Sequence, residues 1–281
     1  MNWRIGNRTL DLTQRGLIMG IVNVTPDSFS DGGRFTDPGR AVEHALAMIA
    51  EGADILDIGG ESTRPGAEPV PEAEELRRVL PVIRAIRTQT PVLISIDTMK
   101  ASVARAALDA GADIINDVTG LRGDAGMVRL AAETNCGLVA MHMTGDPQTM
   151  QHAPRYDDVV AEVRAYLEDR LRILSSAGID PARVVLDPGF GFGKTLEHNL
   201  ALLRELPRLV IADRPLLVGV SRKSMIAKVL NSTDMADRHW PTVALTAFAR
   251  EHGARIIRVH DVRPNREALR MIEAILGHHE G

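Results

Sequence analysis

Eight short apolar runs, spread along the whole chain, each end on a polar or charged residue. The end residues are Asn23, Asp57, Asp97, Asn116, His142, Asp187, Ser221 and His260. A parallel strand that is covered by helices on both faces reads as an unbroken run of Val, Ile and Leu, so the runs predict buried parallel strands. Because the carboxyl ends of such strands meet on one side, polar side chains from eight distant segments are predicted to line one site.

Helix-like segments with apolar residues at three- and four-residue spacing separate these runs. In the clearest one, residues 38–52, Pro38 suits a first helical turn and Gly52 suits the end. Its expected inner stripe consists of Val42, Ala45, Leu46 and Ile49. Further helices are predicted over residues 72–87, 101–110, 125–134, 157–177, 198–206, 223–230 with 242–252, and 264–276. Three of the helices end on EGAD, AGAD or HGAR before the next strand, which indicates a repeated βα unit.

Eight βα units close a (β/α)8 TIM barrel, which is the α/β fold that we expect. The chain has 281 residues, such barrels commonly form one domain, and no linker rich in Pro, Ser or Gly interrupts it. A single domain over residues 1–281 is therefore predicted, with a short hairpin before Leu17 that plugs the barrel floor. The alternative is an open doubly wound sheet, which should carry a phosphate-binding glycine turn after its first strand, where this chain has NVTPDSFSDGG.

Charge and composition argue against nucleic acid as a partner. The net charge is −4 and aromatic residues make up 3% of the chain, whereas duplex binding needs a basic surface and single-strand binding needs stacking aromatics. The lone Cys136 can form no internal disulfide, and no CxxC or HExxH spacing is present. No apolar signal core opens the sequence, and no run approaches the ~18 residues of a membrane span. We therefore expect a soluble cytoplasmic protein that contacts no membrane.

Three strand-end residues, Asp97, Asn116 and Asp187, point to the chemistry of a ligand. An ionised carboxylate that is partly screened from water is costly unless it accepts good hydrogen bonds, and a flat heterocycle with adjacent N–H donors supplies two at once. The inferred ligand is therefore guanidine-like on one edge. The alternative is that each carboxylate pairs with a nearby Arg or Lys.

Cationic residues follow the seventh and eighth strands, in the quarter of a barrel that frequently binds phosphate. They and their polar neighbours are Ser221, Arg222, Lys223, Arg258 and His260. Without a thiol nucleophile, a GxSxG elbow or a nicotinamide fingerprint, the chemistry is expected to rest on charge placement. His142 is a possible base, although a hydrogen-bonded structural role is the favoured alternative.

Two long loops and a glycine-rich stretch complete the predicted site. NVTPDSFSDGGRF and GGESTRPGAEPV, whose polar residues are Asp27, Asp31, Thr63 and Arg64, either cover the site or are solvated connections. LDPGFGFGKT resembles a nucleotide P-loop, but Pro188 takes the place of its first Gly and has no N–H for the phosphate cradle. We expect these glycines to bend the backbone around a ligand, with Phe190 or Phe192 as a flat wall.

Eight phrases, taken together and in order, resemble the bacterial dihydropteroate synthases of folate biosynthesis between about Leu17 and Leu276. The phrases are NVTPDSFSDGG, DIGGESTRPGA, SIDT, IIND, MHM, LDPGFGFGK, VGVSRKSMI and IRVHDV. The resemblance implies a TIM barrel that joins 6-hydroxymethyl-7,8-dihydropterin pyrophosphate to p-aminobenzoate and releases pyrophosphate with the help of Mg²⁺. Trp240 and Pro241 stand where members usually carry a small residue before Ser or Thr, which bears on a helix start and on the surface of the expected homodimer.

The resemblance also implies roles for single residues. The pterin would contact Asp97, Asn116, Met141, Asp187, Gly219, Lys223 and Arg258, the last stacked over the ring. The p-aminobenzoate site would consist of Thr63, Arg64, Pro65, Phe192, Ser221 and Lys223. The pyrophosphate would meet Asn23, Arg64, Arg258 and His260, and Asn23 would also ligate Mg²⁺. The catalytic set implied is Asp97, Lys223, Arg258, His260 and Asp31, of which Asp31 would help to close the site.

An SN1-like mechanism follows from this substrate chemistry. The diphosphate can depart early if cations stabilise its charge and a carboxylate such as Asp97 steadies the pterin cation, after which the aniline nitrogen attacks. Two other functions remain open. A pterin-binding methyltransferase that acts on methyltetrahydrofolate would not need the Ser-Arg-Lys cluster or the Thr-Arg-Pro loop. A non-catalytic pterin-binding paralogue is expected to lose loop residues such as Asn23, Asp31 or Arg64, and all three are present.

Overall fold

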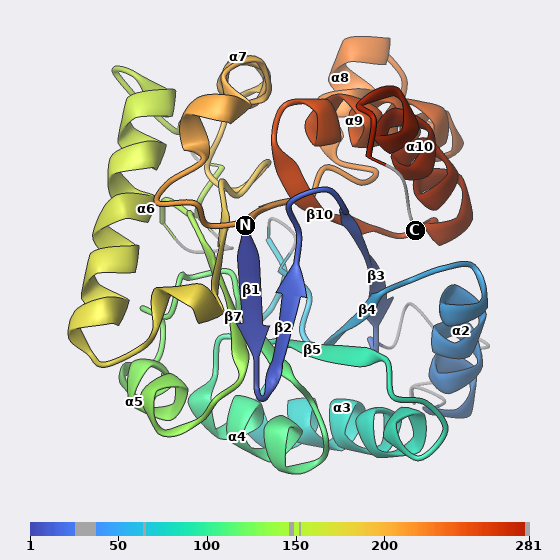
Figure 1. The fold of residues 1–281 in the computed structure, drawn as a ribbon, viewed down its shortest axis with the longest axis vertical. Coiled ribbons are helices and arrows are strands. Elements are labelled where there is room, and N and C mark those ends of the chain that lie inside the picture. The colour runs from blue at the N-terminus through green and yellow to red at the C-terminus, as the bar shows by residue number, and fades with distance from the viewer. Residues whose placement is uncertain (26–37, 64–65, 146–148, 152, 279–281) are drawn as a thin grey trace.

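A closed barrel of eight parallel strands forms the centre of the molecule (Figure 1). The computed structural model describes residues 1–25, 38–63, 66–145, 149–151 and 153–278. The barrel strands are β3 (Leu17–Asn23), β4 (Ile55–Gly59), β5 (Leu93–Asp97), β6 (Ile114–Asp117), β7 (Gly137–Met141), β8 (Val184–Asp187), β9 (Leu216–Val218) and β10 (Ala254–Val259). The barrel closes because β10 pairs in parallel with β3, with Ile256 opposite Leu17. The predicted TIM barrel is confirmed, and the open doubly wound sheet is excluded.

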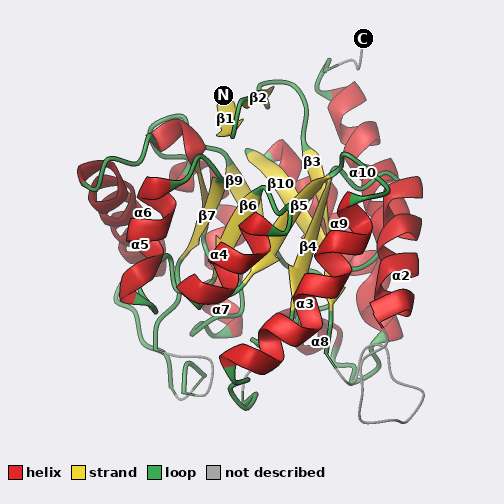
Figure 2. Ribbon diagram, turned by 90° about the horizontal axis from the view of Figure 1, so that it is seen from below, coloured by secondary structure: helices red, strands yellow, loops and turns green. Residues whose placement is uncertain are grey.

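Helices enclose the strands on the outside of the barrel (Figure 2). They are α2 (Pro38–Ala50), α3 (Glu72–Arg87), α4 (Ala101–Asp109), α5 (Ala125–Glu133), α6 (Val159–Ser176), α7 (Leu196–Arg204), α8 (Ser224–Leu230), α9 (His239–Glu251) and α10 (Val262–Ile275). Short 3₁₀ turns lie at η1 (Pro181–Arg183), η2 (Leu206–Leu209) and η3 (Ala236–Arg238). Among the described residues, no helix combines the length and the apolar character that crossing a bilayer requires.

Three predicted helix starts were late, one of them that of α10, which begins at Val262 and was predicted from residue 264. The helix predicted from residue 198 begins at Leu196, because the Thr195 side chain caps it and His198 completes a capping box. The helix predicted from residue 242 begins at His239, so Trp240 and Pro241 lie in its first turn. A proline is tolerated there because its missing N–H would have no partner within the helix.

The inner face of α2 was also predicted imperfectly. The buried residues are Ala41, Ala45 and Met48, whereas Val42 and Ile49 of the predicted stripe pack on the core only partly buried. The reason lies in β3, where Gly20 leaves space for Met48: a Cβ atom on Gly20 would stand 2.9 Å from the Met48 sulfur. The helix therefore turns its smaller residues and Met48 toward the barrel.

The N-terminal hairpin of β1 (Asn2–Ile5) and β2 (Arg8–Asp11) lies across the opening of the barrel where the strands begin (Figure 1). Trp3 is fully buried, and its indole N–H donates to the carbonyl of Arg183 at 2.9 Å. The hairpin packs on inward-facing barrel residues, and the shared cluster comprises Trp3, Ile5, Leu12, Leu17, Met19, Ile55, Leu93, Ile114, Val139, Val185, Leu217 and Ile256. The predicted plug at the barrel floor is confirmed, so the opposite end is the one available for a site.

Candidate active site

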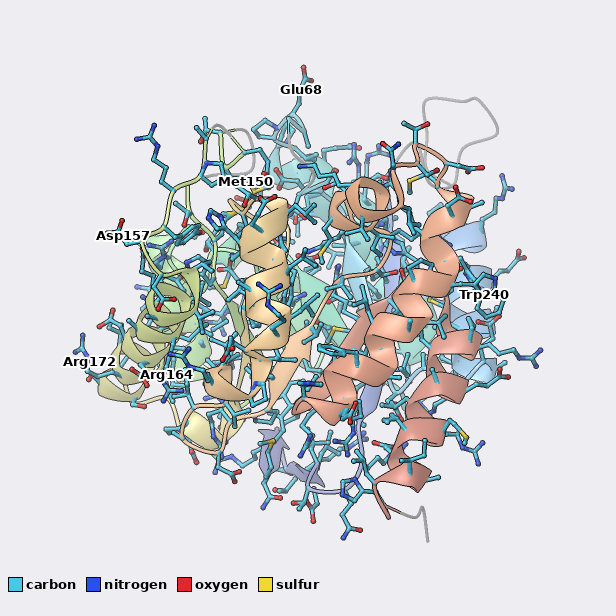
Figure 3. All side chains as sticks on the ribbon, turned by 90° about the horizontal axis from the view of Figure 1, so that it is seen from above. Glu68, Met150, Asp157, Arg164, Arg172 and Trp240 are labelled. Carbon is cyan, nitrogen blue, oxygen red and sulfur yellow. The ribbon has the colours of Figure 1, made fainter. Side chains whose placement is uncertain are left out.

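Sheet register brings the predicted strand-end residues together at the carboxyl end of the barrel. Asp97 lies opposite Gly59 on one side and Asn116 on the other. Met141 lies opposite Asp187. Figure 3 shows Glu68, from the loop before α3, and Met150, from the loop before α6, at this same end of the molecule. The convergence predicted from the eight apolar runs is therefore present.

Arg258 joins the carboxylates of two strands. Its Nε donates to Asp57 Oδ2 at 2.6 Å, and its Nη2 donates to Asp97 Oδ2 at 2.7 Å. The amide of Asn116 donates to the same Asp57 oxygen at 3.0 Å. The alternative prediction, that a strand-end carboxylate pairs with a nearby Arg or Lys, is therefore correct for Asp97. The Arg258 side chain is still 22% exposed, so it can also contact a ligand.

Asp57 is a site residue that the sequence reasoning missed. It was recognised only as a strand end, yet it is fully buried and receives both Arg258 and Asn116. Its Oδ1 has no hydrogen-bond partner within the described part of the chain. The signal was its place in the same series of strand ends as Asp97, since both positions point into the barrel mouth. Asp57 orients the two residues that the family resemblance assigns to the pterin.

Burial controls the charge of Asp97. Removal from water raises its pKa to about 7, an effect that Arg258 opposes and that the charges of Asp57, Glu75 and Asp117 increase. A carboxyl group with this pKa changes its protonation state near neutral pH. Asp97 can therefore accept hydrogen bonds from a cationic or N–H-rich ring edge, and such a ligand would favour its ionised form.

Asp187 and Lys223 form the second charged pair of the mouth. Asp187 is buried, which raises its pKa, and its Oδ1 accepts a hydrogen bond from the backbone N–H of Gly189 at 2.7 Å. Burial lowers the pKa of Lys223 to about 8, against the attraction of Asp187. The Lys223 ammonium donates to the carbonyl of Phe190 and lies 4.5 Å from the centre of the Phe192 ring. Phe190 itself is fully buried in the core, so only Phe192 serves as the predicted wall.

Ser221 and His260 meet beside this pair. Ser221 Oγ and His260 Nδ1 are 2.9 Å apart, and the backbone N–H of His260 donates to Ser221 Oγ at 3.2 Å. Gly219 lies next to Arg258, because a Cβ atom there would stand 3.8 Å from Arg258 Cβ. The predicted anion corner is therefore assembled from β9 and β10.

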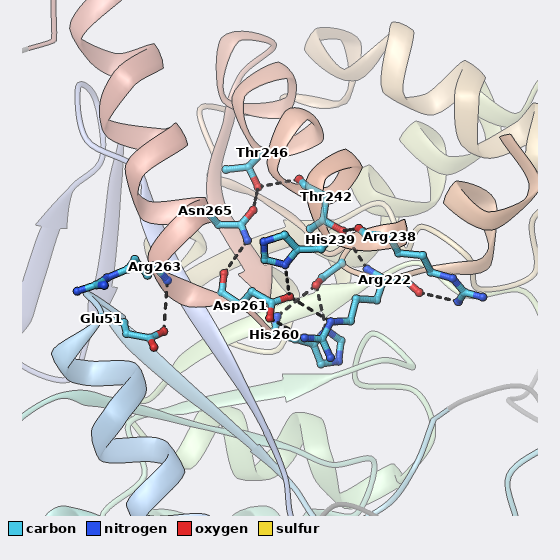
Figure 4. Close-up of polar contacts among 11 residues, drawn as sticks. Glu51, Arg222, Arg238, His239, Thr242, Thr246, His260, Asp261, Arg263 and Asn265 are labelled. Carbon is cyan, nitrogen blue, oxygen red and sulfur yellow. Dashed lines mark hydrogen bonds and ion pairs between the residues drawn. The ribbon is translucent and has the colours of Figure 1, made fainter. Parts of the chain in front are cut away.

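Arg222 does not belong to this corner as expected. Its Nε and Nη2 donate to the two oxygens of Asp261 at 3.1 and 2.6 Å (Figure 4). Its backbone has a φ of +57°, and Arg238 donates to its carbonyl at 3.0 Å. The turn places Ser221 and Lys223 toward the mouth and directs the Arg222 guanidinium to Asp261.

The glycine-rich stretch after β8 is a structural turn. Gly189, Gly191 and Gly193 all have positive φ, between 61° and 77°. The Lys194 ammonium is buried and donates to the carbonyls of Gly189 and Phe192 at 2.9 and 3.0 Å. A P-loop lysine would reach outward to phosphate, so the rejection of a nucleotide site is confirmed for this lysine.

His142 has the structural role that was favoured. Its Nδ1 lies 2.9 Å from the Lys194 ammonium, and its ring packs edge-on against Tyr166. Burial, together with the charges of Lys194 and Arg122, lowers its pKa to about 2. A ring this difficult to protonate and already bonded to Lys194 is unsuited to act as a base near neutral pH.

Of the remaining predicted residues, three lie within the described part of the chain and four lie outside it. Asn23 is partly buried at the end of β3, and Met141 is 3% exposed and packs with Val118, Met143 and Met150 beside Met99 and Phe192. Thr63 is partly buried after β4. Asp27, Asp31, Arg64 and Pro65 lie outside the described residues.

Asn23, within the described part of the chain, is the residue to which the family resemblance assigns Mg²⁺. Among the described residues, no three His, Cys, Asp or Glu side chains converge on a metal position. Mg²⁺ is commonly bound by one or two protein oxygens together with substrate phosphates and water. The Asn23 amide oxygen at the barrel mouth fits that pattern as a ligand to a metal carried in with a diphosphate.

Comparison with known proteins identifies the family of the chain. The family model for the pterin binding enzymes matches residues 19–260. Dihydropteroate synthase of Escherichia coli K12 is 50% identical over 259 residues, covering 92% of this chain and 91% of that protein. The Xanthomonas albilineans dihydropteroate synthase structure with 4-aminobenzoic acid has a TM-score of 0.91 and 47% identity, covering 98% of this chain and 99% of that one.

A further solved structure is similar to this chain and contains a bound ligand. The Burkholderia cenocepacia dihydropteroate synthase complexed with 7,8-dihydropteroate has a TM-score of 0.89 and 46% identity, covering 98% of this chain and 96% of that one. Fold, strand-end chemistry and likeness along nearly the full length agree. The chain belongs to the pterin-binding enzyme family and, within it, to the dihydropteroate synthases.

Proposed function

We propose that the chain condenses 6-hydroxymethyl-7,8-dihydropterin pyrophosphate with p-aminobenzoate to give 7,8-dihydropteroate and pyrophosphate. The observation that carries this proposal is the composition of one barrel mouth. Buried acceptors, Asp97 and Asp187, share it with the cations Lys223 and Arg258. We call the two carboxylates the acidic half of the mouth and the two cations its cationic half. A substrate with an N–H-rich edge matches the acidic half, and its diphosphate matches the cationic half. The relatives that contain 4-aminobenzoic acid and 7,8-dihydropteroate support the same pair of substrates.

The acidic half accounts for pterin binding. Asp97 and Asp187 would accept hydrogen bonds from the ring edge, and Asn116, fixed by Asp57, would present its amide beside them. Met141 and Gly219 would line the slot, and Arg258 would stack over the ring. The charges are placed before the substrate arrives, so little reorganisation is needed during the reaction.

The cationic half accounts for the leaving group. Arg258 and His260 would meet the diphosphate, together with Asn23 and, as the resemblance implies, Arg64. Asn23 would be the protein ligand of Mg²⁺, which would supply positive charge that favours departure of the diphosphate. As the methylene–oxygen bond breaks, its electron pair leaves with the diphosphate, and Asp97 stabilises the positive charge that remains on the pterin.

The second substrate then attacks from the neighbouring wall. Phe192 lies against Lys223, so the two can hold the ring and carboxylate of p-aminobenzoate, with Ser221 and Thr63 nearby in the predicted site. The aniline nitrogen forms the new bond to the methylene carbon and then loses a proton. The resemblance further implies that Asp31, with Arg64 and Pro65, closes this side.

A homodimer is proposed as the assembled form. All seven large apolar side chains that the described residues leave exposed lie between Val229 and Leu276, on or beside α8, α9 and α10. Concentrated exposed apolar surface is typical of association sites. The cytoplasmic location and the absence of nucleic acid and membrane partners stay predictions from the sequence.

The activity is tested by mixing purified protein with the pterin pyrophosphate, p-aminobenzoate and Mg²⁺ and measuring pyrophosphate and dihydropteroate. We expect both products to form at equal rates and only when p-aminobenzoate is present. Methyl transfer from methyltetrahydrofolate, without pyrophosphate release, would instead favour the methyltransferase alternative. Pterin binding without either reaction would favour a non-catalytic paralogue.

A further inference from the structure

Three charged side chains form a buried cluster beside the active site, between β4, α3 and the start of α4. The Lys100 ammonium donates to Glu61 Oε2 and, at 2.6 Å, to Glu75 Oε2. The Glu75 side chain is fully buried and that of Glu61 is 8% exposed. Buried carboxylates remain ionised only when they are paired. Lys100 is therefore the cation that keeps both glutamates in place.

Glu61 fixes the two ends of the loop between β4 and α3. Its second oxygen, Oε1, accepts a hydrogen bond from the backbone N–H of Val70 at 3.1 Å. The preceding carbonyl, of Gly60, accepts from Arg78 Nη1 at 2.8 Å. One carboxylate thus ties the start of the loop to its return, and Thr63 lies between the two tied points.

Lys100 also belongs to the segment that follows Asp97. It is the N-cap residue of α4, and its backbone N–H donates to Thr98 Oγ1 at 3.2 Å. The strand before it, β5, is paired with β4 so that Asp97 lies opposite Gly59. The same lysine therefore connects the end of β5, which contacts the pterin in the proposed function, with the loop that carries Thr63 of the p-aminobenzoate site.

We propose that Lys100 is a positioning residue that holds the β4–α3 loop against the end of β5 and thereby aligns the p-aminobenzoate site with the pterin site. The inference rests on the proposed function. The pterin edge is built from strand-end side chains and has its own hydrogen bonds, none of which involves Lys100. Loss of the Lys100 charge should therefore affect the second substrate selectively.

The test compares Lys100→Met with Arg105→Met. Lys100→Met keeps a long apolar stem but removes the ammonium, whereas Arg105→Met, on α4, removes an exposed ion pair to Glu133 at the end of α5. We expect the KM for p-aminobenzoate to rise about tenfold or more in Lys100→Met, with a smaller change in kcat and in the KM for the pterin pyrophosphate. Arg105→Met should match the wild type, and Lys100→Arg should recover part of the lost affinity.

A second variant and a readout without catalysis keep the test informative. Lys100→Met leaves two buried carboxylates without a cation, so Glu61→Gln, which removes only one charge, is measured in parallel. Hydrogen exchange over residues 61–70 should accelerate in both variants, because the oxygen that accepts the Val70 N–H is no longer held by the Lys100–Glu61 ion pair, while exchange over the strands of the barrel stays unchanged.

Two results would overturn the inference: equal KM changes for both substrates, or folded variants whose exchange over residues 61–70 equals that of the wild type. Failure of the proposed function gives a different result, namely no pyrophosphate release by the wild-type enzyme. The exchange measurement decides the structural role of Lys100 in either case.

Discussion

At the scale of single residues, Asp97 has the property that most directly controls the chemistry. Burial brings its pKa to about 7, so the ionised form that would stabilise a pterin cation decreases as the pH falls below this value. We expect kcat/KM for the pterin substrate to have an acid limb with its midpoint near pH 7, because this parameter reports ionisations of the free enzyme. Asp97→Asn should lower kcat about 100-fold or more and abolish the limb, while pterin affinity changes less.

Measurement of kcat and kcat/KM across the pH range tests this prediction, and Asp117→Asn is the matched control. Burial raises the pKa of Asp117 also, to about 6, but its carboxylate bonds to Thr119 instead of Arg258. The control should keep the acid limb. Turnover by Asp97→Asn equal to that of the wild type would contradict the role of this carboxylate.

Lys194 provides a residue-scale prediction about stability. Burial lowers its pKa from 10.5 to about 7, so between these values the unfolded chain binds more protons than the folded one, and raising the pH favours folding. Lys194→Met removes the donor to two carbonyls and to His142, at a cost of about 1–3 kcal/mol. The free-energy gap between wild type and variant should widen from pH 7 to about pH 10.

Urea unfolding at several pH values measures that gap. The exposed Lys228 supplies the control, because Lys228→Met removes a solvated side chain and should change the free energy of unfolding by no more than about 0.5 kcal/mol. If the difference in free energy of unfolding between the wild type and Lys194→Met instead became smaller as the pH rises, the folded protein would keep this lysine charged.

Sequence reasoning succeeded for residues whose position follows from a strand end and failed where a partner decides the role. Asp97, Asn116 and Asp187 were predicted because strand ends converge in any parallel barrel. Arg222 was placed in the anion corner by its charge alone, and its contact with Asp261 depends on a turn with positive φ that its residue type does not announce. The role of Asp57 was overlooked because it consists in accepting a hydrogen bond from Arg258, which is distant in sequence.

At the scale of elements, the N-terminal hairpin is a structural plug at the end opposite the site. Trp3→Ala should destabilise the fold by about 3–5 kcal/mol, since it empties a fully buried position and leaves the Arg183 carbonyl without its donor. The kinetic constants of the folded variant should stay close to those of the wild type. Urea unfolding and turnover assays on the same preparation check both statements.

The control for the hairpin is Arg4→Ala, on the same strand, which removes a half-exposed ion pair to Asp180. Such pairs contribute about 1 kcal/mol or less. If Trp3→Ala lowered the free energy of unfolding by no more than Arg4→Ala does, the hairpin would not be part of the hydrophobic core of the barrel.

Element boundaries followed from the sequence where the apolar periodicity was strong. The predicted helix over residues 72–87 matches α3 at both ends. The face of α2 could not be read from its own sequence, because Gly20 on a neighbouring strand decides which side approaches the barrel. Such errors come from contacts between elements, which periodicity within one element does not contain.

At the scale of the whole molecule, the apolar surface of the last helices predicts self-association. Trp240, on α9, is 71% exposed, and Ile275, on α10, is 68% exposed. We expect sedimentation velocity to show a homodimer, and Trp240→Glu to shift it toward the monomer. Arg172→Glu is the control, because Arg172 lies on the other side of the molecule from Trp240 (Figure 3). A monomeric wild type at micromolar concentration would contradict the dimer.

The contact of Arg258 with Asp57 and Asp97 has a consequence for inhibitor affinity. In this structure the Arg258 guanidinium already donates to Asp97 Oδ2, one of the acceptors that a pterin edge would use. Binding is then an exchange of one charge-assisted hydrogen bond for another, so its enthalpy gains little from that edge. A competitor therefore gains more from contacts that leave Arg258 in place than from added donors aimed at Asp97.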